Sequence, residues 1–213
     1  MKNKEILISV VQESGRYDLA DNVTDTTITP TNTLLRLANS AQRYLDIAVR
    51  FAIFSESTYV TLQKDSNYIV RPFDYIHSIK INNHELVWKQ YFPLNPDPAI
   101  YTGLPLSFCF KEDLERRVYF DVYADRDYTL EISGCNHVAE ITNSNLENET
   151  WWSKYHPELL IAQIKYEIAM SIDRNLNEAQ EYKVHINDII TGIKQKYYYE
   201  GLNATSALDR KFT

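Results

Sequence analysis

The side chains that could do chemistry are few, and their spacing does not join them into a site. The five histidines are His77, His84, His137, His156 and His185. No two of them lie at a metal-ligand spacing such as His-Glu-x-x-His. The string Gly134–His137 holds the cysteine, asparagine and histidine of a thiol protease. Neighbouring residues at a strand end point in different directions, however, and such triads are assembled from distant segments, so a structural role is favoured.

The acidic and glycine-containing motifs are equally weak. Asp121, Asp125 and Asp127 could offer oxygens to calcium, but the glycine and the closing glutamate of an EF-hand loop are absent, which favours a solvated turn. The five glycines are too scattered for a phosphate loop or a dinucleotide fingerprint. Any two of the 29 acids could form a glycosidase pair, yet nothing singles one out. We therefore expect no catalytic residue, no metal, no cofactor and no enzymatic activity.

Charge and composition narrow the classes of partner. The chain of 213 residues carries a formal net charge of −7, and its longest basic stretch is Lys194-Gln195-Lys196. Direct binding to nucleic acid is disfavoured, because a DNA-binding protein carries a basic face. Cys109 and Cys135 are interpreted as buried free thiols in a reducing cell. The sequence shows neither a signal peptide nor a run of about 18 apolar residues, so no membrane span is expected.

The periodicity of apolar residues predicts an α+β fold. It is near 3.6 residues before about residue 52, near 2 from there to about residue 133, and near 3.6 again after Trp151. This order predicts a helical bundle of about four helices with an antiparallel β module, a sandwich or small barrel, inserted between helix two and helix three. The expected parts are a first helical half at 1–52, the β module at 53–142, a second helical half at 143–201 and a C-terminal tail at 202–213.

Local signals place the helices. A short helix is expected at 2–13, and a second begins with Thr29 as cap and Pro30 in its first turn. The apolar stripe of the second helix contains Leu34, Leu37, Ala38, Ala41, Leu45, Ala48, Val49 and Ala52. Pro157 fits the first turn of a third helix, and Gly201 is expected to end a fourth.

Alternating patterns place the strands. They contain Val60 and Leu62, Ile79 and Ile81, and the stretches 106–110, 118–122 and 128–133. A turn is expected at 111–113, and the three prolines at 93–98 predict a loop.

The pair Trp151-Trp152 is the most conspicuous aromatic feature. It is interpreted either as a plug at the junction between the β module and helix three or as an anchor for a partner subunit. In the tail, Leu208 and Phe212 have no element to bury them, so this segment either dangles or becomes ordered on a neighbour. The candidate interface residues are Trp151, Trp152, Leu202, Leu208 and Phe212.

Four short motifs follow one another along the chain. They are NSAQRYL at 39–45, RPFDYI at 71–76, GLP at 103–105 and WWSKYHPELL at 151–160. In this order they resemble the head–tail adaptor (connector) proteins of tailed, especially short-tailed, bacteriophages, whose patterns are N-x-A-Q-x-x-L, L-P-x-D-F-x, G-x-P-x-x-Y and P-x-x-L. The likeness spans about Thr29 to Gly201. Arg71 stands where that family usually has leucine, and the loop at 93–98 has no counterpart in its pattern.

The resemblance implies a structural virion protein without a cofactor. Such adaptors form a homo-oligomeric ring, usually of twelve copies, beneath the portal protein of the phage head. The ring extends the DNA channel, which DNA passes without sequence-specific binding, and it docks tail proteins. The implied location is the head–tail junction of the virion, and the host cytoplasm during assembly. C-terminal segments in this family commonly reach the portal or a neighbouring subunit.

Two alternatives remain open from the sequence. One is a β-rich binding module on a helical stalk, which recognises a glycan or a protein through aromatic residues in a concave patch. The other is a cell-wall hydrolase with an unrecognised carboxylate pair.

Overall fold

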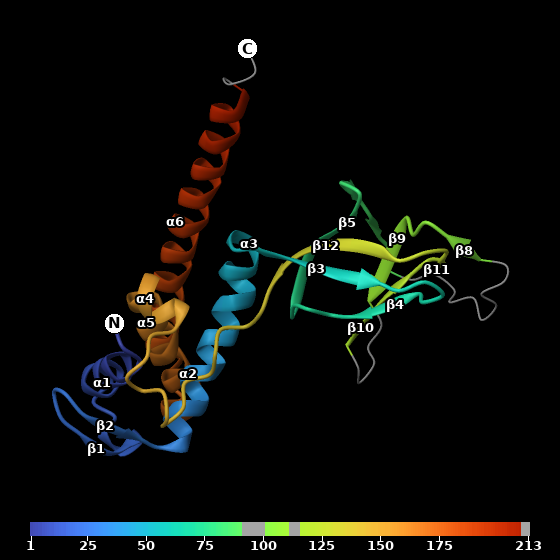
Figure 1. Ribbon diagram of the computed structural model, residues 1–213. Coiled ribbons are helices and arrows are strands. Elements are labelled where there is room, and N and C mark those ends of the chain that lie inside the picture. The colour runs from blue at the N-terminus through green and yellow to red at the C-terminus, as the bar shows by residue number, and fades with distance from the viewer. Residues whose placement is uncertain (91–100, 111–115, 210–213) are drawn as a thin grey trace. The chain divides into compact units, whose positions relative to one another are not determined.

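The protein has an α+β fold made of two compact units. The computed structural model describes residues 1–90, 101–110 and 116–209, with side chains described as far as residue 198. The helical unit contains residues 1–53 and the chain from His137 onward, and the β unit contains Phe54–Asn136 (Figure 1). Each unit has its own apolar core.

The second boundary between the units differs from the expected one. The segment 137–142, which the sequence assigned to the β module, belongs to the helical unit. Its Ile141 is only 1% exposed and lies in the core of the helical unit. This segment has no regular secondary structure, so periodicity could not assign it to either unit.

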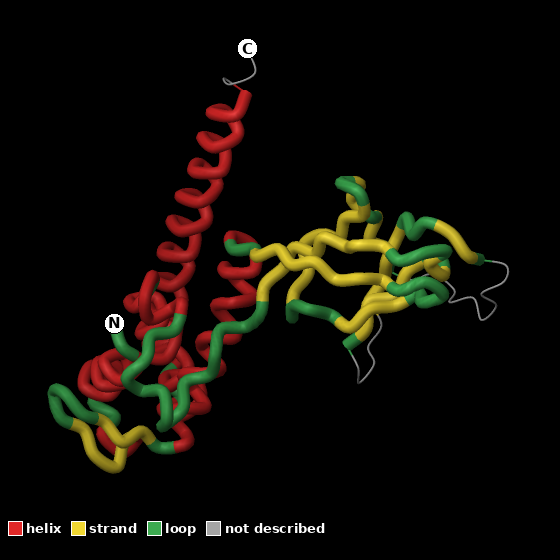
Figure 2. The backbone as a smooth tube through the Cα atoms, in the orientation of Figure 1, coloured by secondary structure: helices red, strands yellow, loops and turns green. Residues whose placement is uncertain are grey.

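The helical unit consists of six helices and a small hairpin among the described residues (Figure 2). The helices are α1 (Asn3–Ser14), α2 (Asn32–Leu45), α3 (Phe51–Ile53), α4 (Trp151–Tyr155), α5 (Pro157–Ile168) and α6 (Leu176–Asp209). One π-helical turn, Asp46–Arg50, joins α2 to α3, and another, Ala169–Asp173, follows α5. The antiparallel strands β1 (Ala20–Val23) and β2 (Ile28–Pro30) form the hairpin, after a 3-10 turn at Tyr17–Leu19.

The start of α2 differs from the prediction. Pro30 ends strand β2, and Thr31 is the cap, since its hydroxyl accepts a hydrogen bond of 3.3 Å from the Leu34 amide. The segment between α1 and α2 forms the β1–β2 hairpin, which was not predicted from the sequence. The predicted stripe is buried from Leu34 to Leu45 and at Val49, whereas Ala48 is half-buried and Ala52 at its end is exposed.

The last helix is longer than expected. Gly201 was predicted to end it, but α6 continues to Asp209. The residues expected to form a tail from 202 onward are therefore helical as far as 209. Along the first part of α6, the side chains of Ala179, Ile186, Ile190 and Ile193 are buried.

The β unit is built from two four-stranded sheets around one core. The first sheet has the order β3-β12-β5-β6 and the second has the order β4-β10-β9-β7. The strands are β3 (Glu56–Leu62), β4 (Tyr68–Val70), β5 (Tyr75–Ile81), β6 (His84–Glu85), β7 (Val87–Trp88), β8 (Thr102–Gly103), β9 (Ser107–Phe110), β10 (Arg117–Phe120), β11 (Tyr123–Ala124) and β12 (Tyr128–Cys135). Most pairs are antiparallel, while β7 with β9 and β8 with β11 are parallel.

The chain passes directly from one sheet to the other at Leu86. Strand β6 pairs with β5, and strand β7, beginning one residue after Leu86, pairs with β9. Leu86 itself is buried, and its amide donates a hydrogen bond of 2.8 Å to the carbonyl oxygen of Ile79. One short segment thus links the edges of both sheets. The predicted loop at 93–98 and the predicted turn at 111–113 lie outside the described residues.

Candidate functional site

A pocket of about 420 Å³ lies in the β unit, beside the point where the chain changes sheets. We call it the aromatic pocket. Its lining comes from the segment before β5, from β5 itself, and from the neighbouring strands β7 and β9. The lining residues are Arg71, Asp74, Tyr75, Ile76, His77, Trp88, Phe108 and Phe110.

The aromatic side chains of this pocket are held in place by one another. The rings of Tyr75 and His77 meet edge to face with centroids 5.0 Å apart, and Phe108 and Phe110 do the same at 5.5 Å. Phe108 is almost fully buried, whereas Tyr75 is 46% and Trp88 is 55% exposed. Two large aromatic side chains of the pocket therefore stand open to solvent, while a third, Phe108, is buried.

Charged groups complete the lining. The guanidinium of Arg71 lies over the ring of Phe110, 4.5 Å from its centroid. The carboxylate of Asp74 forms an ion pair with Arg116. The backbone amide of Asp74 donates a hydrogen bond of 2.9 Å to the side-chain oxygen of Asn136, which fixes the loop that carries it.

Gly134 on β12 allows the chain to pass close to Tyr75, at the start of β5. A Cβ atom at this position would lie 2.3 Å from the carbonyl oxygen of Tyr75 and 2.8 Å from the ring of Phe73. The pairing of β12 with β5 shifts register between Ser133 and Gly134. A bulge of this kind redirects side chains locally, and only glycine leaves room for the close approach.

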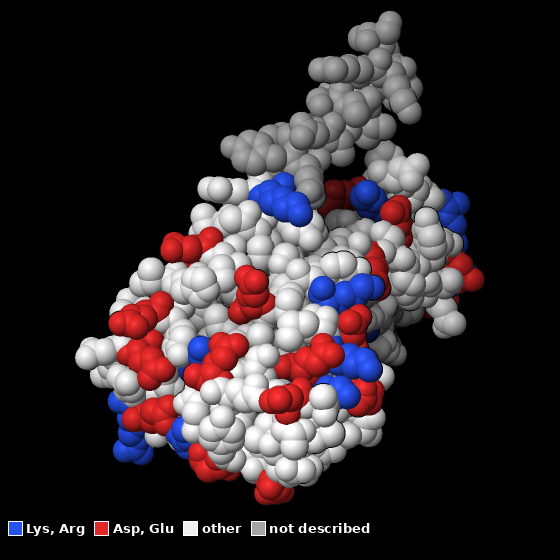
Figure 3. Space-filling view, turned by 90° about the vertical axis from the view of Figure 1, so that its left-hand side faces the viewer, with Lys and Arg blue, Asp and Glu red and all other residues white. Residues whose placement is uncertain are grey.

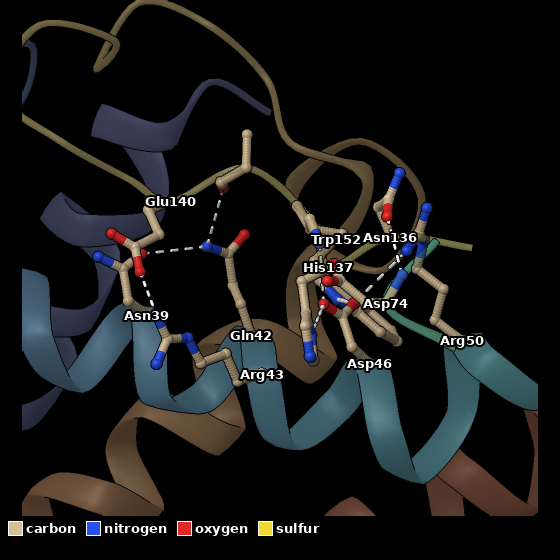
Figure 4. A network of polar contacts seen from close by, with 12 residues as sticks. Asn39, Gln42, Arg43, Asp46, Arg50, Asp74, Asn136, His137, Glu140 and Trp152 are labelled. Atoms are coloured by element: carbon tan, nitrogen blue, oxygen red, sulfur yellow. Dashed lines mark hydrogen bonds and ion pairs between the residues drawn. The ribbon is translucent and has the colours of Figure 1, made fainter. Parts of the chain in front are cut away.

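The helical unit contains a buried polar centre at Asp46, shown in Figure 4. Asp46 is 0% exposed. Its carboxylate accepts hydrogen bonds from the Trp152 indole at 2.8 Å, the Val138 amide at 2.9 Å and the His137 ring at 3.0 Å. Arg50, one turn further along, lies 4.0 Å away. A buried carboxylate needs such donors, and here they join three separate parts of the chain.

The polar face of α2 continues this network. Asn39 donates a hydrogen bond of 3.0 Å to the carbonyl of Ile141 and accepts one of 2.7 Å from its amide. Gln42 donates to the carbonyl of Ala139 at 3.5 Å, and Arg43 pairs with Glu140. The role of this polar face in binding segment 137–141 was not predicted from the sequence.

The two candidate tryptophans have different environments. Trp152 is 0% exposed and lies in the core of the helical unit. Its side chain is therefore not available as an anchor for a partner subunit. Trp151 is half-buried, packed edge to face against Trp152 with centroids 4.7 Å apart. The other candidates stay untested: Leu202 and Leu208 lie in α6 beyond the described side chains, and Phe212 lies outside the described residues.

The polar motifs noted in the sequence have structural roles. In the string 134–137, the side chain of Asn136 binds the Asp74 amide, while the ring of His137 binds Asp46. Asp121 accepts from the amide of Leu106 and the hydroxyl of Ser107. Asp125 accepts from the Tyr128 hydroxyl, and Asp127 from the Lys64 amide. In the part of the chain that the structure describes, no cluster of side chains could hold a metal ion.

His156 and Tyr128 are among the titratable groups whose pKa values are shifted. Burial lowers the pKa of His156 below its usual value, and the nearby charge of Lys196 lowers it further. Burial also raises the pKa of the Tyr128 hydroxyl, and its hydrogen bond to Asp125 adds to this effect. Neither residue lines the aromatic pocket.

A second hollow surface lies on the helical unit, between α5 and α6. We call it the helical groove, and it consists of two adjoining hollows of about 320 and 310 Å³ that share Tyr166 and Lys183. Three exposed apolar side chains line it, Tyr44 at 46%, Met170 at 40% and Leu176 at 69%.

No protein-family model matches the chain, and no curated protein matches it either. Among the residues described, no helix combines the length and apolar character needed to cross a bilayer.

Proposed function

We propose that this chain is a structural, non-enzymatic subunit of a virion, a ring adaptor at the junction of head and tail. In this role copies of the chain associate beneath the portal, extend the DNA channel and dock tail proteins. The resemblance of the four motifs supplies the function, and the length of α6 is the observation that supports it most directly.

The helix α6 is much longer than the helix it packs against. It has 34 residues and α5 has 12, which correspond to about 51 and 18 Å at 1.5 Å per residue. Because α5 is so short, the C-terminal part of α6 extends beyond it (Figure 1). A protruding helix of this kind is suited to contact another subunit.

A closed ring also needs a second, different surface on each subunit. Head-to-tail contacts join unlike patches, and they generate a ring when the rotation between subunits closes. The helical groove offers exposed apolar side chains for such a contact, in particular Met170 and Leu176. We assign it to the contact between copies.

The surface charge suits a DNA channel that must not bind phosphates. The net charge is −7. On the face drawn in Figure 3, acidic side chains separate the basic ones, so the basic side chains form no continuous patch there. Such a surface gives DNA little electrostatic attraction.

Truncation of α6 tests the proposal. The full chain and a version ending at Tyr198 are purified, and their folding is compared by circular dichroism. Each is then mixed with the portal protein of the same virus and studied by analytical ultracentrifugation and negative-stain microscopy. We expect the full chain to form rings of about twelve copies on the portal, and the truncated chain to remain folded but unassembled. A full chain that ignores the portal would contradict the adaptor function, and a truncated chain that assembles normally would contradict the role of α6.

One observation favours a second candidate, the β-rich binding module. Such a module would expose aromatic residues in a concave patch, and the aromatic pocket places Tyr75 and Trp88 in this way. The two functions are compatible within one chain, because the pocket lies in the β unit and α6 in the helical unit.

A further inference from the structure

We propose that the outer edge of strand β3 pairs with the same edge of a second copy of this chain, antiparallel and about a two-fold axis. The pairing goes beyond the proposed adaptor function, because a ring built from head-to-tail contacts contains no two-fold contact between neighbours. It therefore concerns the free subunit before assembly. The proposal is supported by the length of this edge, its composition, the burial pattern of the strand and the charges at its two ends.

The edge formed by β3 is much longer than the other edges of the two four-stranded sheets. The edge strands are β3 and β6 in one sheet and β4 and β7 in the other. β3 has seven residues, whereas β4 has three and β6 and β7 have two each. Very short edge strands are a common protection against pairing with other chains. Three of these four edges have that protection, and β3 lacks it.

The outer side of β3 offers backbone hydrogen-bonding groups. The ladder of β3 with β12 runs from Glu56 to Leu62 without a shift in register. In an antiparallel ladder, alternate residues direct their amide and carbonyl groups away from the paired strand, so three or four of the seven residues of β3 direct these groups outward. Among the described strands none receives them, since β4, the next strand along the chain, pairs with β10.

The composition of β3 favours strand pairing. Its sequence, Glu-Ser-Thr-Tyr-Val-Thr-Leu, contains neither proline nor lysine, two residues that commonly protect an edge. Threonine, tyrosine and valine are enriched in strands. The side chain of Tyr59 is 71% exposed, so it is available for a cross-strand contact with a second chain.

The burial of alternate side chains limits the register. Ser57, Tyr59 and Thr61 are exposed. Val60 is half-buried and Leu62 is buried, on the opposite face of the strand. Residues that lie directly opposite each other in an antiparallel pair point to the same face. Two copies therefore keep their exposed faces together only when odd positions meet odd positions, and on a two-fold axis this places one residue of β3 opposite itself.

The charges at the two ends of the strand select Val60 as that residue. With Val60 opposite itself, Glu56 lies opposite Lys64 of the second copy. Both side chains are exposed, and within the described part of the chain neither forms an ion pair. The two-fold axis forms this pair of opposite charges twice, and such pairs stabilise neighbouring strands.

A second copy also suits this edge better than an unlike strand. Pairing between unlike edges leaves a free edge on each copy, so the contacts grow into open filaments when the rotation does not close. Pairing of β3 with itself closes after two copies and covers the exposed edge in both. An unlike strand as the occupant becomes an outcome of the test.

The association of the full chain tests the pairing. Sedimentation velocity at increasing concentration should show a monomer–dimer equilibrium with a micromolar dissociation constant, because a pair of short strands is a small interface. Hydrogen exchange read by NMR should become slower at alternate amides of β3 as the dimer forms. A chain that stays monomeric at millimolar concentration, or β3 amides whose exchange does not depend on concentration, would overturn the proposal.

Reversal of the end charges tests the register. E56K and K64E should each weaken the dimer about ten-fold, because each sets like charges opposite each other twice. The double variant E56K/K64E restores opposite charges and should regain nearly the native affinity. The matched control is E85K, which reverses an exposed acid on the edge strand β6 and should leave the dimer unchanged. A double variant as weak as the single ones would contradict the register.

Thermal unfolding of each variant shows whether it is folded. K64E lies in a turn beyond the strand, so it keeps the test decisive if E56K does not fold. A peptide with the sequence of residues 56–64 should compete with the dimer, whereas a peptide with the same residues in scrambled order should not. Equal competition by both peptides would show that the edge accepts any strand, and would overturn the assignment to a second copy.

The pairing of β3 and the formation of rings are separate results. E56K and K64E leave α6 and the helical groove intact, so both variants should still form rings with the portal. Loss of rings in the chain truncated at Tyr198 should in turn leave the β3 dimer unchanged.

Discussion

Replacing Asp46 by alanine should destabilise the helical unit more than any surface change. The substitution removes the acceptor for the Trp152 indole and the Val138 amide, both of which donate at under 3 Å. Hydrogen bonds to a charged group contribute about 1.5–3 kcal/mol each. Removing one member of a buried charged set typically costs about 3–5 kcal/mol, because the remaining groups stay buried without a partner. We therefore expect D46A to lower the free energy of unfolding by about 3–5 kcal/mol.

The assay must report the helical unit alone, since the two units could unfold separately. The chain has three tryptophans, and Trp88 is the one in the β unit. In a W88F background, tryptophan fluorescence during urea unfolding therefore reports the helical unit, and linear extrapolation gives the free energy. The matched control is D188A, at an exposed acid on α6, which should change stability by less than about 0.5 kcal/mol.

A double-mutant cycle isolates the contact between Asp46 and Trp152. W152F removes the indole donor, and combining it with D46A should give a coupling energy of about 1–3 kcal/mol. A loss below about 1 kcal/mol for D46A, or additive effects of D46A and W152F, would refute the assignment of Asp46 as the centre that joins α2, α4 and segment 137–141.

Two further predictions concern backbone space and pH. G134A should destabilise the β unit by more than about 2 kcal/mol, because the added Cβ would lie 2.3 Å from the Tyr75 carbonyl oxygen. G192A, in a helix with nothing within 4 Å of the added Cβ, should instead stabilise the protein by up to about 1 kcal/mol. Thermal unfolding compares the two variants, and equal effects would contradict the argument. Burial and Lys196 hold the pKa of His156 below its usual 6.5, so the unfolded chain takes up the proton first and stability falls as the pH drops through 6.5. H156Q should lose less stability than the native chain between about pH 7 and 5 in urea unfolding, and parallel curves would exclude His156 as the source.

The fold class followed from periodicity because both periods are strong. The stripe of α2 is buried from Leu34 to Leu45, and the apolar faces of β10 and β12 line the core of the β unit. Periodicity describes only regular elements, however. Segment 137–142 has no period, and its place was decided by hydrogen bonds to Asn39 and Asp46 that are 102 and 92 residues away in sequence.

The candidate site was harder to predict from the sequence than the fold class. The pocket brings Arg71 and Tyr75 together with Trp88 and Phe110, and the chain order gives no sign that these positions meet. Trp152 stood out as aromatic, but its indole donates a hydrogen bond to Asp46, an acid more than 100 residues earlier, and nothing in the sequence indicated this contact. Asp46 stands one turn before Arg50, on a face that also holds Asn39 and Gln42. This pattern was the signal in the sequence that another segment covers the face.

The motifs that carry the resemblance mostly build the subunit itself. Asn39 and Gln42 bind the backbone of segment 139–141, and Trp152 fills the core of the helical unit. Side chains used in this way cannot also contact a partner. These motifs therefore bear on the fold of the subunit more directly than on its assembly with other subunits. Among the described side chains, the helical groove and the aromatic pocket keep exposed apolar surface, and the proposed function adds the C-terminal part of α6 as a contact. Experiments on assembly should therefore change these surfaces and leave the motifs intact, because a motif variant that fails to assemble would report only that its helical unit no longer folds.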